Sequence, residues 1–153
     1  MRYAVTMFCA LTLAQACAHH ETTTASTTGE RTVARSPEEA GGEQVCGNAQ
    51  VFFESGSASL DQAAHERLDR YATCLSDHEI DAIYVSGTTD PAGDTDANLT
   101  LGRERARNVA DYLHDRGCHV DFVIRSFGER DALDSAPLWP VERAADVTAV
   151  ATH

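Results

Sequence analysis

Apolar residues recur with a helical period in two segments of the chain. In residues 59–76 they are spaced three and four apart, as in an amphipathic helix, and Asp61 and Glu66 are among the polar residues between them. Residues 100–116 carry a second stripe, with Thr100 as the expected N-cap and Gly117 as the expected stop. The two stripes are Leu60, Ala64, Leu68, Tyr71, Ala72 and Leu75, then Ala106, Val109, Ala110 and Leu113.

Four short runs rich in β-branched and aromatic residues predict strands. They are VFFE at 51–54, IDAIYVS at 80–86, HVDFVIRSFG at 119–128 and VTAVA at 147–151. With the helices, they give the order strand, helix, strand, helix, strand, strand. This order predicts an α/β (α+β) domain, a two-layer β-α-β-α-β-β sandwich with both helices on one face of a mixed four-stranded sheet.

The first 16 residues predict export. Arg2 precedes an uncharged apolar run that is typical of a secretory signal peptide and shorter than the about 20 residues that span a bilayer. The segment LAQAC at 13–17 contains a small-x-small site for ordinary signal peptidase, and it also resembles a bacterial lipobox. We favour the lipobox, which predicts acylation of Cys17 and anchoring in the outer membrane, facing the periplasm. Cleavage by ordinary signal peptidase would instead give a soluble periplasmic protein.

Residues 17–45 predict a flexible linker after the signal peptide. Apart from the acylated cysteine, they are mainly Thr, Ser, Glu, Gly and Ala, with almost no large apolar side chain to offset the entropy of ordering. The remaining residues, 46–153, have the length of one ordinary domain.

Charge and residue spacing exclude several classes of function. The chain has 12 Arg and Lys against 24 Asp and Glu, a formal net charge of −12, so its field repels nucleic acid. No CxxC spacing or alternation of His with Cys indicates a metal site, and we expect no cofactor. No serine lies at a recognisable spacing from a histidine, so we expect no enzyme.

Three cysteines fall in the predicted domain. Cys46 precedes the first strand and Cys74 lies near the end of the first helix, two places that a β-α-β unit can bring together. A disulfide between them would leave Cys118 free. Pairing of Cys74 with Cys118, or three unpaired cysteines, remains open.

The segment from Ser86 to Leu113 carries the candidate chemistry. Pro91 disfavours helical torsions at Asp90, so the Asp90 carboxylate should lie at the end of a strand. Arg105 is expected in the first turns of the next helix, where backbone N–H groups favour an anion. Such an Asp and Arg suit a zwitterion, the ammonium on Asp90 and the carboxylate on Arg105. A direct Asp90–Arg105 bond without a ligand is the alternative.

The predicted domain resembles the OmpA-like C-terminal domain, a peptidoglycan-binding module also found in peptidoglycan-associated lipoproteins. The matching residues are VFFESGSASL at 51–60, VSGTTDPAGDTDANLTLGRERARNVADYL at 85–113 and SFGE at 126–129. The middle block fits the family pattern G-x-T-D-x-x-G, then Asn, then L-S/T-x-x-R-A-x-x-V-x-x-Y-L. The resemblance implies the two-layer fold already predicted, and non-catalytic binding of peptidoglycan that tethers the outer membrane to the cell wall.

By position in this pattern, the resemblance also implies a binding site for the diaminopimelate of the peptidoglycan stem peptide. Asp90 matches the family's acid, Arg105 its helix arginine and Asn98 its loop asparagine. The other expected groove residues are Thr88, Thr89, Gly93 and Leu101.

One family motif is altered near the C-terminus. The N-R-R-V motif is Ala144-Ala145-Asp146-Val147 here, so Arg143 or Arg125 would have to supply the missing positive charge. The alternative function is therefore an OmpA-like protein-interaction module of an envelope complex, with weak or lost affinity for peptidoglycan.

Overall fold

The computed structural model describes residues 42–129 and 138–151. The predicted signal peptide, the acylation site Cys17 and the linker as far as residue 41 lie outside the described residues, so they stay predictions. Within the described ranges, no helix combines the length and the apolar character needed to cross a membrane.

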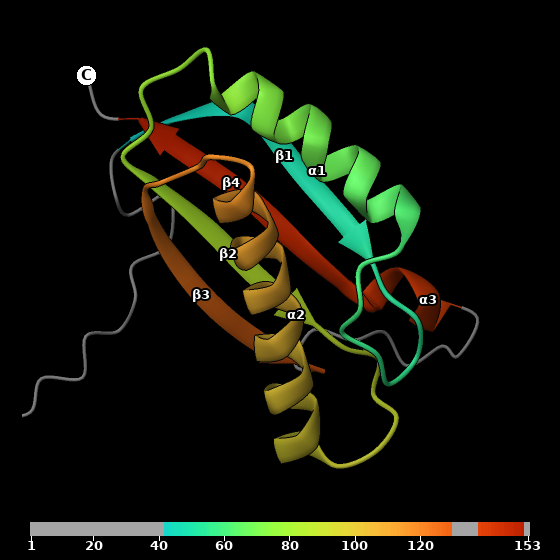
Figure 1. The fold of residues 1–153 in the computed structure, drawn as a ribbon. Coiled ribbons are helices and arrows are strands. Elements are labelled where there is room, and N and C mark those ends of the chain that lie inside the picture. The colour runs from blue at the N-terminus through green and yellow to red at the C-terminus, as the bar shows by residue number, and fades with distance from the viewer. Residues whose placement is uncertain (1–41, 130–137, 152–153) are drawn as a thin grey trace, which may run out of the picture. The chain divides into compact units, whose positions relative to one another are not determined.

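The described residues form a four-stranded sheet with the two long helices on one face (Figure 1). The strand order is β1-β4-β2-β3; β2 and β3 are parallel, and β4 is antiparallel to both of its neighbours. The predicted two-layer fold with a mixed sheet is therefore confirmed. The elements are β1 (Glu43–Phe52), α1 (Gln62–Leu75), β2 (Ala82–Thr88), α2 (Thr95–Asp115), β3 (Asp121–Gly128), α3 (Trp139–Glu142) and β4 (Ala144–Ala151).

The core lies between the helices and the sheet. The predicted helical stripes face inward, and alternate residues of the strands meet them because side chains of a strand point to opposite faces in turn. Each fully buried Leu, Ile or Val contributes roughly 1.5–3 kcal/mol. The most deeply buried are Leu68, Val109 and Leu113 of the helices and Val51, Ile83, Val85 and Val147 of the strands.

Two glycines let α2 approach the sheet closely. A Cβ atom at Gly87 of β2 would lie 1.8 Å from the carbonyl oxygen of Gly102 in α2. A Cβ atom at Gly102 would lie 2.9 Å from the carbonyl oxygen of Gly87. The helix and the strand thus touch backbone to backbone, and this contact sets the position of the loop between them.

Strands β1 and β4 both begin earlier than predicted. β1 starts at Glu43, inside the segment assigned to the linker, and its pairing with β4 shifts between Val45 and Asn48. Cys46 and Gly47, between them, have φ angles of 61° and 66°. This bulge breaks the alternation by which a strand is predicted. β4 begins at Ala144, three residues before the predicted start. The prediction missed Ala144 and Ala145 because alanine is a weak strand former.

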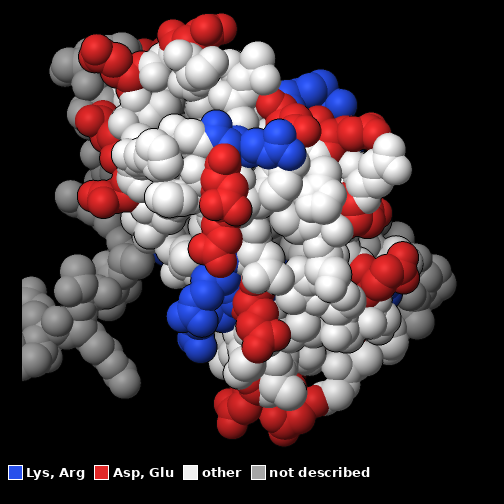
Figure 2. Space-filling model, viewed as in Figure 1, with Lys and Arg blue, Asp and Glu red and all other residues white. Residues whose placement is uncertain are grey.

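The helical face of the molecule is acidic. Figure 2 shows more red than blue groups on this face, and red groups gather at the end where α2 begins in Figure 1. Asp94 and Asp96 lie there and are exposed, whereas Arg103 and Arg107 are the exposed cations further along the helix. The field at this end of α2 therefore favours cationic ligands.

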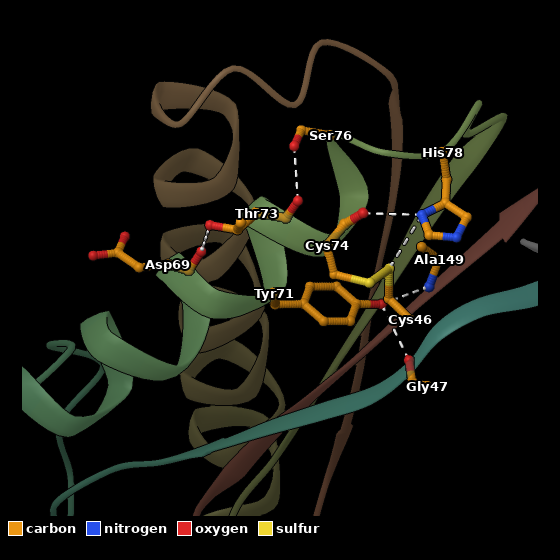
Figure 3. The surroundings of a disulfide bond; sticks show 9 residues. All are labelled: Cys46, Gly47, Asp69, Tyr71, Thr73, Cys74, Ser76, His78 and Ala149. Atoms are coloured by element: carbon orange, nitrogen blue, oxygen red, sulfur yellow. Dashed lines mark hydrogen bonds between the residues drawn. A yellow bond between two sulfur atoms is a disulfide. The ribbon is translucent and has the colours of Figure 1, made fainter.

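A disulfide joins Cys46 to Cys74, with their Cα atoms 6.0 Å apart (Figure 3). It ties the β1 bulge to the last turn of α1. The Tyr71 hydroxyl adds a second connection, because it donates to the carbonyl oxygen of Gly47 at 3.3 Å and accepts from the amide of Ala149 at 2.9 Å. Burial raises the pKa of Tyr71 to about 12. Cys118 is the free cysteine of the described residues.

Replacing both Cys46 and Cys74 by serine should lower the free energy of unfolding by on the order of 3 kcal/mol. The disulfide closes a loop with a sequence separation of 28, and its loss releases that constraint on the unfolded chain. Urea denaturation monitored by circular dichroism would measure the change. Cys118→Ser is the control and should cost much less; equal losses in the two variants would contradict the prediction.

Candidate functional site

The candidate residues meet at one end of the sheet, where the strands end and their connections begin. β1, β2 and β3 run in the same direction and β4 runs against them, so the carboxyl ends of the first three lie beside the start of β4. The connections leaving these strands therefore converge. Two backbone hydrogen bonds link them, from the amide of Phe53 to the carbonyl oxygen of Arg143 at 2.7 Å and from the amide of Thr89 to that of Gly128 at 2.9 Å.

Asp90 lies at this end of the sheet, two residues beyond the end of β2. It is 6% exposed, and its Oδ1 accepts from the amide of Ala92 at 3.2 Å. Its Oδ2 lies 3.3 Å from the guanidinium of Arg143, at the start of β4. Arg143 also donates from Nε to the carbonyl oxygen of Phe53 at 3.2 Å. The arginine that pairs with Asp90 is therefore Arg143, which the sequence indicated only as a possible substitute.

The side chain of Asn98 makes hydrogen bonds to the backbone of the loop after Asp90. Its Nδ2 donates to the carbonyl oxygens of Asp90 and Ala92, at 3.3 and 3.2 Å, and to the carboxylate of Glu129. Glu129 also accepts from the Thr95 hydroxyl at 2.6 Å. The hydrogen bond from Thr95 has the largest effect on the pKa of Glu129, and together with that from Asn98 it lowers this pKa. Asn98 is only 5% exposed, so it positions the loop and leaves little surface for a ligand.

Helix α2 begins earlier than predicted. Its N-cap is Asp94, whose carboxylate accepts from the amides of Asp96 and Ala97, and the helix starts at Thr95. The expected N-cap Thr100 lies inside the helix, where its hydroxyl donates to the carbonyl oxygen of Asp96 at 3.0 Å. The prediction that Arg105 lies in the first turns of this helix, beside free N–H groups, is therefore wrong.

Arg105 is buried completely, with 0% exposure. Its guanidinium donates to three backbone carbonyl oxygens, two in the β1–α1 connection and one at the end of β2, and lies over the ring of Phe53, 5.1 Å from the centroid. Burial lowers its pKa to about 10 against the opposing effect of Asp90, which leaves the side chain charged at neutral pH. The three bonds run from Nε to Ser57 at 2.8 Å, from one terminal nitrogen to Thr88 at 2.7 Å and from the other to Glu54 at 3.1 Å.

The other predicted groove residues differ in their surroundings. The Thr88 hydroxyl donates to the carbonyl oxygen of Glu142 at 2.7 Å, which connects the end of β2 to the end of α3. The hydroxyl of Thr89 is buried beside Asp90 and has no hydrogen-bond partner among the described residues. Gly93 turns the loop with a φ of 103° and faces open space. Leu101 is half-buried on α2.

The altered motif lies within β4. Ala144 and Ala145 are buried. Asp146 pairs in register with Gln50 and Ser86, and its carboxylate accepts from Gln50 at 2.8 Å. Burial raises the pKa of Asp146. Its carboxylate is thus bonded within the sheet, to the neighbouring strand β1.

A groove of about 330 Å³ opens beside Arg143. Phe52, Pro140 and Val141 supply apolar walls, and Phe52 and Val141 are 41% and 55% exposed. An elongated ligand whose charged end reached Arg143 could therefore extend along an apolar surface.

Comparison with known proteins identifies the fold family. The sequence profile of the OmpA family matches residues 52–145, more than half of the chain. The chain belongs to the OmpA family.

Relatives of this OmpA-family chain include envelope proteins. Outer membrane protein A of Serratia odorifera is 39% identical over 84 residues, which cover 53% of this chain and 35% of that protein. The peptidoglycan-associated lipoprotein of Rhizobium meliloti is 37% identical over 67 residues, which cover 44% of this chain and 38% of that protein. This chain thus matches well under half the length of these curated relatives.

Solved structures show the same fold. The crystal structure of the peptidoglycan-associated lipoprotein from Burkholderia pseudomallei superposes with a TM-score of 0.61 at 27% sequence identity. The match covers 66% of this OmpA-family chain and 89% of that one.

Proposed function

We propose that this OmpA-family domain binds peptidoglycan without catalysis and, through an acylated Cys17, tethers the outer membrane to the cell wall. Relatives named peptidoglycan-associated lipoprotein and a relative named peptidoglycan-binding protein support this function. The observation that carries it is the Asp90–Arg143 pair at one end of the sheet, beside an open groove.

The pair suits the zwitterionic end of diaminopimelate in the stem peptide. A single contact of 3.3 Å joins the carboxylate to the guanidinium, and Arg143 keeps several N–H donors for other acceptors. A ligand ammonium would bind Asp90 while a ligand carboxylate binds Arg143. Each of these two side chains would then replace its contact with the other by a contact with the ligand. Arg105, with its bonds to backbone carbonyls, would support this site from inside the fold.

Asp90→Asn should abolish co-sedimentation of the purified full-length protein with insoluble peptidoglycan. The substitution keeps the size of the side chain but removes the charge that would bind the ammonium. Loss of one partner from a buried charged hydrogen bond costs on the order of 2 kcal/mol or more, roughly a 30-fold loss of affinity. Arg143→Gln should weaken binding similarly.

Two exposed residues of α2 supply matched controls for charge. Asp111→Asn and Arg103→Gln change the net charge by the same amounts and should leave sedimentation unchanged. If the Asp90→Asn and Arg143→Gln proteins both sediment as the wild type does, the assigned site is refuted. If the wild type fails to sediment even at low salt, the alternative function, a protein-interaction module of an envelope complex, is favoured.

A further inference from the structure

The imidazole of His78 lies beside the disulfide (Figure 3). Cys46 follows Val45, which pairs with Ala149 near the end of β4, so this site lies at the end of the sheet opposite Asp90. His78, three residues after the end of α1, donates from Nδ1 to the carbonyl oxygen of Cys74 at 2.9 Å. The same nitrogen lies 3.8 Å from Sγ of Cys46. One ligand atom from each of Cys46, Cys74 and His78 lies within 4.8 Å of the other two.

We propose that reduction of this disulfide creates a binding site for a soft metal cation of the Zn²⁺ or Cu⁺ class. The ligands would be the thiolates of Cys46 and Cys74 and the Nδ1 atom of His78. Thiolate and imidazole are the ligands that these cations prefer. The disulfide form has no thiolate to offer, so the redox state of the pair decides whether the site exists.

The reduction needs a partner, for which we name a dithiol reductant. Each cysteine sulfur gains one electron and one proton as the S–S bond breaks, and the two thiols of the reductant are oxidised to a disulfide. Metal binding then displaces the two thiol protons to solvent. The His78 proton passes from Nδ1 to Nε2, and Nδ1 exchanges its bond to the carbonyl oxygen of Cys74 for the metal.

Contacts other than the disulfide keep the two cysteines close after reduction. The Tyr71 hydroxyl binds Gly47, the neighbour of Cys46, and Ala149 of β4. Backbone pairing of β1 with β4 continues on both sides of the bulge. Cys74 lies in the last turn of α1, which packs on the core through Leu68 and Leu75.

The geometry requires only a small movement. With metal–sulfur distances of about 2.3 Å, a tetrahedral site places its two sulfurs roughly 3.7 Å apart. The Cα separation of 6.0 Å allows this by rotation of the side chains.

A hydrated cation can reach the site. Cys46 and Cys74 line one open pocket of about 270 Å³, and His78 lines another of about 210 Å³. Water can therefore fill the fourth position, and the net charge of −12 favours the approach of a cation.

Titration with Co²⁺, as a spectroscopic probe, would test the proposal on the untagged full-length protein. The protein reduced without oxygen should bind one equivalent and show thiolate-to-cobalt charge transfer, and Zn²⁺ should displace the Co²⁺. The oxidised protein should show neither signal. Zn²⁺ should also raise the Tm of the reduced protein and leave that of the oxidised protein unchanged.

Variants separate this site from other donors. Cys46→Ser or Cys74→Ser should abolish the charge-transfer band, and His78→Ala should weaken binding by on the order of 10-fold or more. The reduced Cys118→Ser protein is the matched control and should bind as the wild type does. Loss of binding in this control, or no binding by the reduced wild type, would overturn the proposal. A reduced chain that is unfolded and does not refold with Zn²⁺ would overturn it too.

Discussion

Replacement of Arg105 by alanine is expected to lower the free energy of unfolding by about 3–5 kcal/mol, the range for removing one partner of a buried charged interaction. The guanidinium is completely buried and donates to three backbone carbonyl oxygens, which belong to Glu54, Ser57 and Thr88. Alanine would leave these acceptors buried without their donors and would open a cavity beside Phe53. Loss of the proposed peptidoglycan binding in this variant would then follow from loss of the fold.

Chemical denaturation and sedimentation together distinguish this role from direct ligand binding. Arg103→Ala and Arg107→Ala remove the same side chain from exposed positions of the same helix and should change stability by no more than about 0.5 kcal/mol. If Arg105→Ala keeps wild-type stability and loses only sedimentation, Arg105 binds the ligand directly, as the family resemblance implies.

Gly87→Ala is expected to destabilise the domain by about 3 kcal/mol or more. The added Cβ would lie 1.8 Å from the carbonyl oxygen of Gly102. The Cβ position is fixed by the backbone of β2, and the oxygen belongs to the backbone of α2. No side-chain rotation relieves such a clash, so α2 must move away from β2 and loosen the core around Val109. The movement should also displace the loop that carries Asp90.

Thermal and urea unfolding would measure this effect against Gly93, which lies in the connection between β2 and α2. Gly93→Ala meets no atom within 4 Å and is strained only by its φ of 103°, so its cost should be smaller, about 1–2 kcal/mol. A Gly87→Ala protein as stable as the Gly93→Ala protein would show that the helix and the strand are not in the close contact described.

Local patterning was enough to predict most of the fold. Leu68 and Leu113 lie on stripes of helical period, and Val85 lies in a run of strand formers, so the two long helices and the four strands were recognised from the local sequence. The short helix α3 was not predicted. The same local reasoning failed where a feature depends on a distant partner. β1 was predicted too short because its bulge at Cys46 and Gly47 is stabilised by pairing with β4 and by Tyr71.

The start of α2 shows a different limit. Asp94 and Thr100 are both good N-cap residues, and the sequence alone favoured Thr100 because the apolar stripe begins after it. The structure selects Asp94, and Asn98, in the first turns, binds both the preceding loop and Glu129 after β3. Contacts with residues 31 positions away therefore support the longer helix.

By itself, the sequence determined the two-layer fold and the family, and it selected the segment around Asp90 as the candidate site, because these depend on periodicity and on a motif of fixed spacing. Only the tertiary structure decided which arginine faces Asp90. Arg105 lies 15 residues from Asp90 and Arg143 lies 53 residues away, yet the partner is Arg143, since β4 returns antiparallel beside β2. Arg105 points instead into the protein, where carbonyl groups from the β1–α1 connection and from the end of β2 meet. No pattern along the chain reports that convergence.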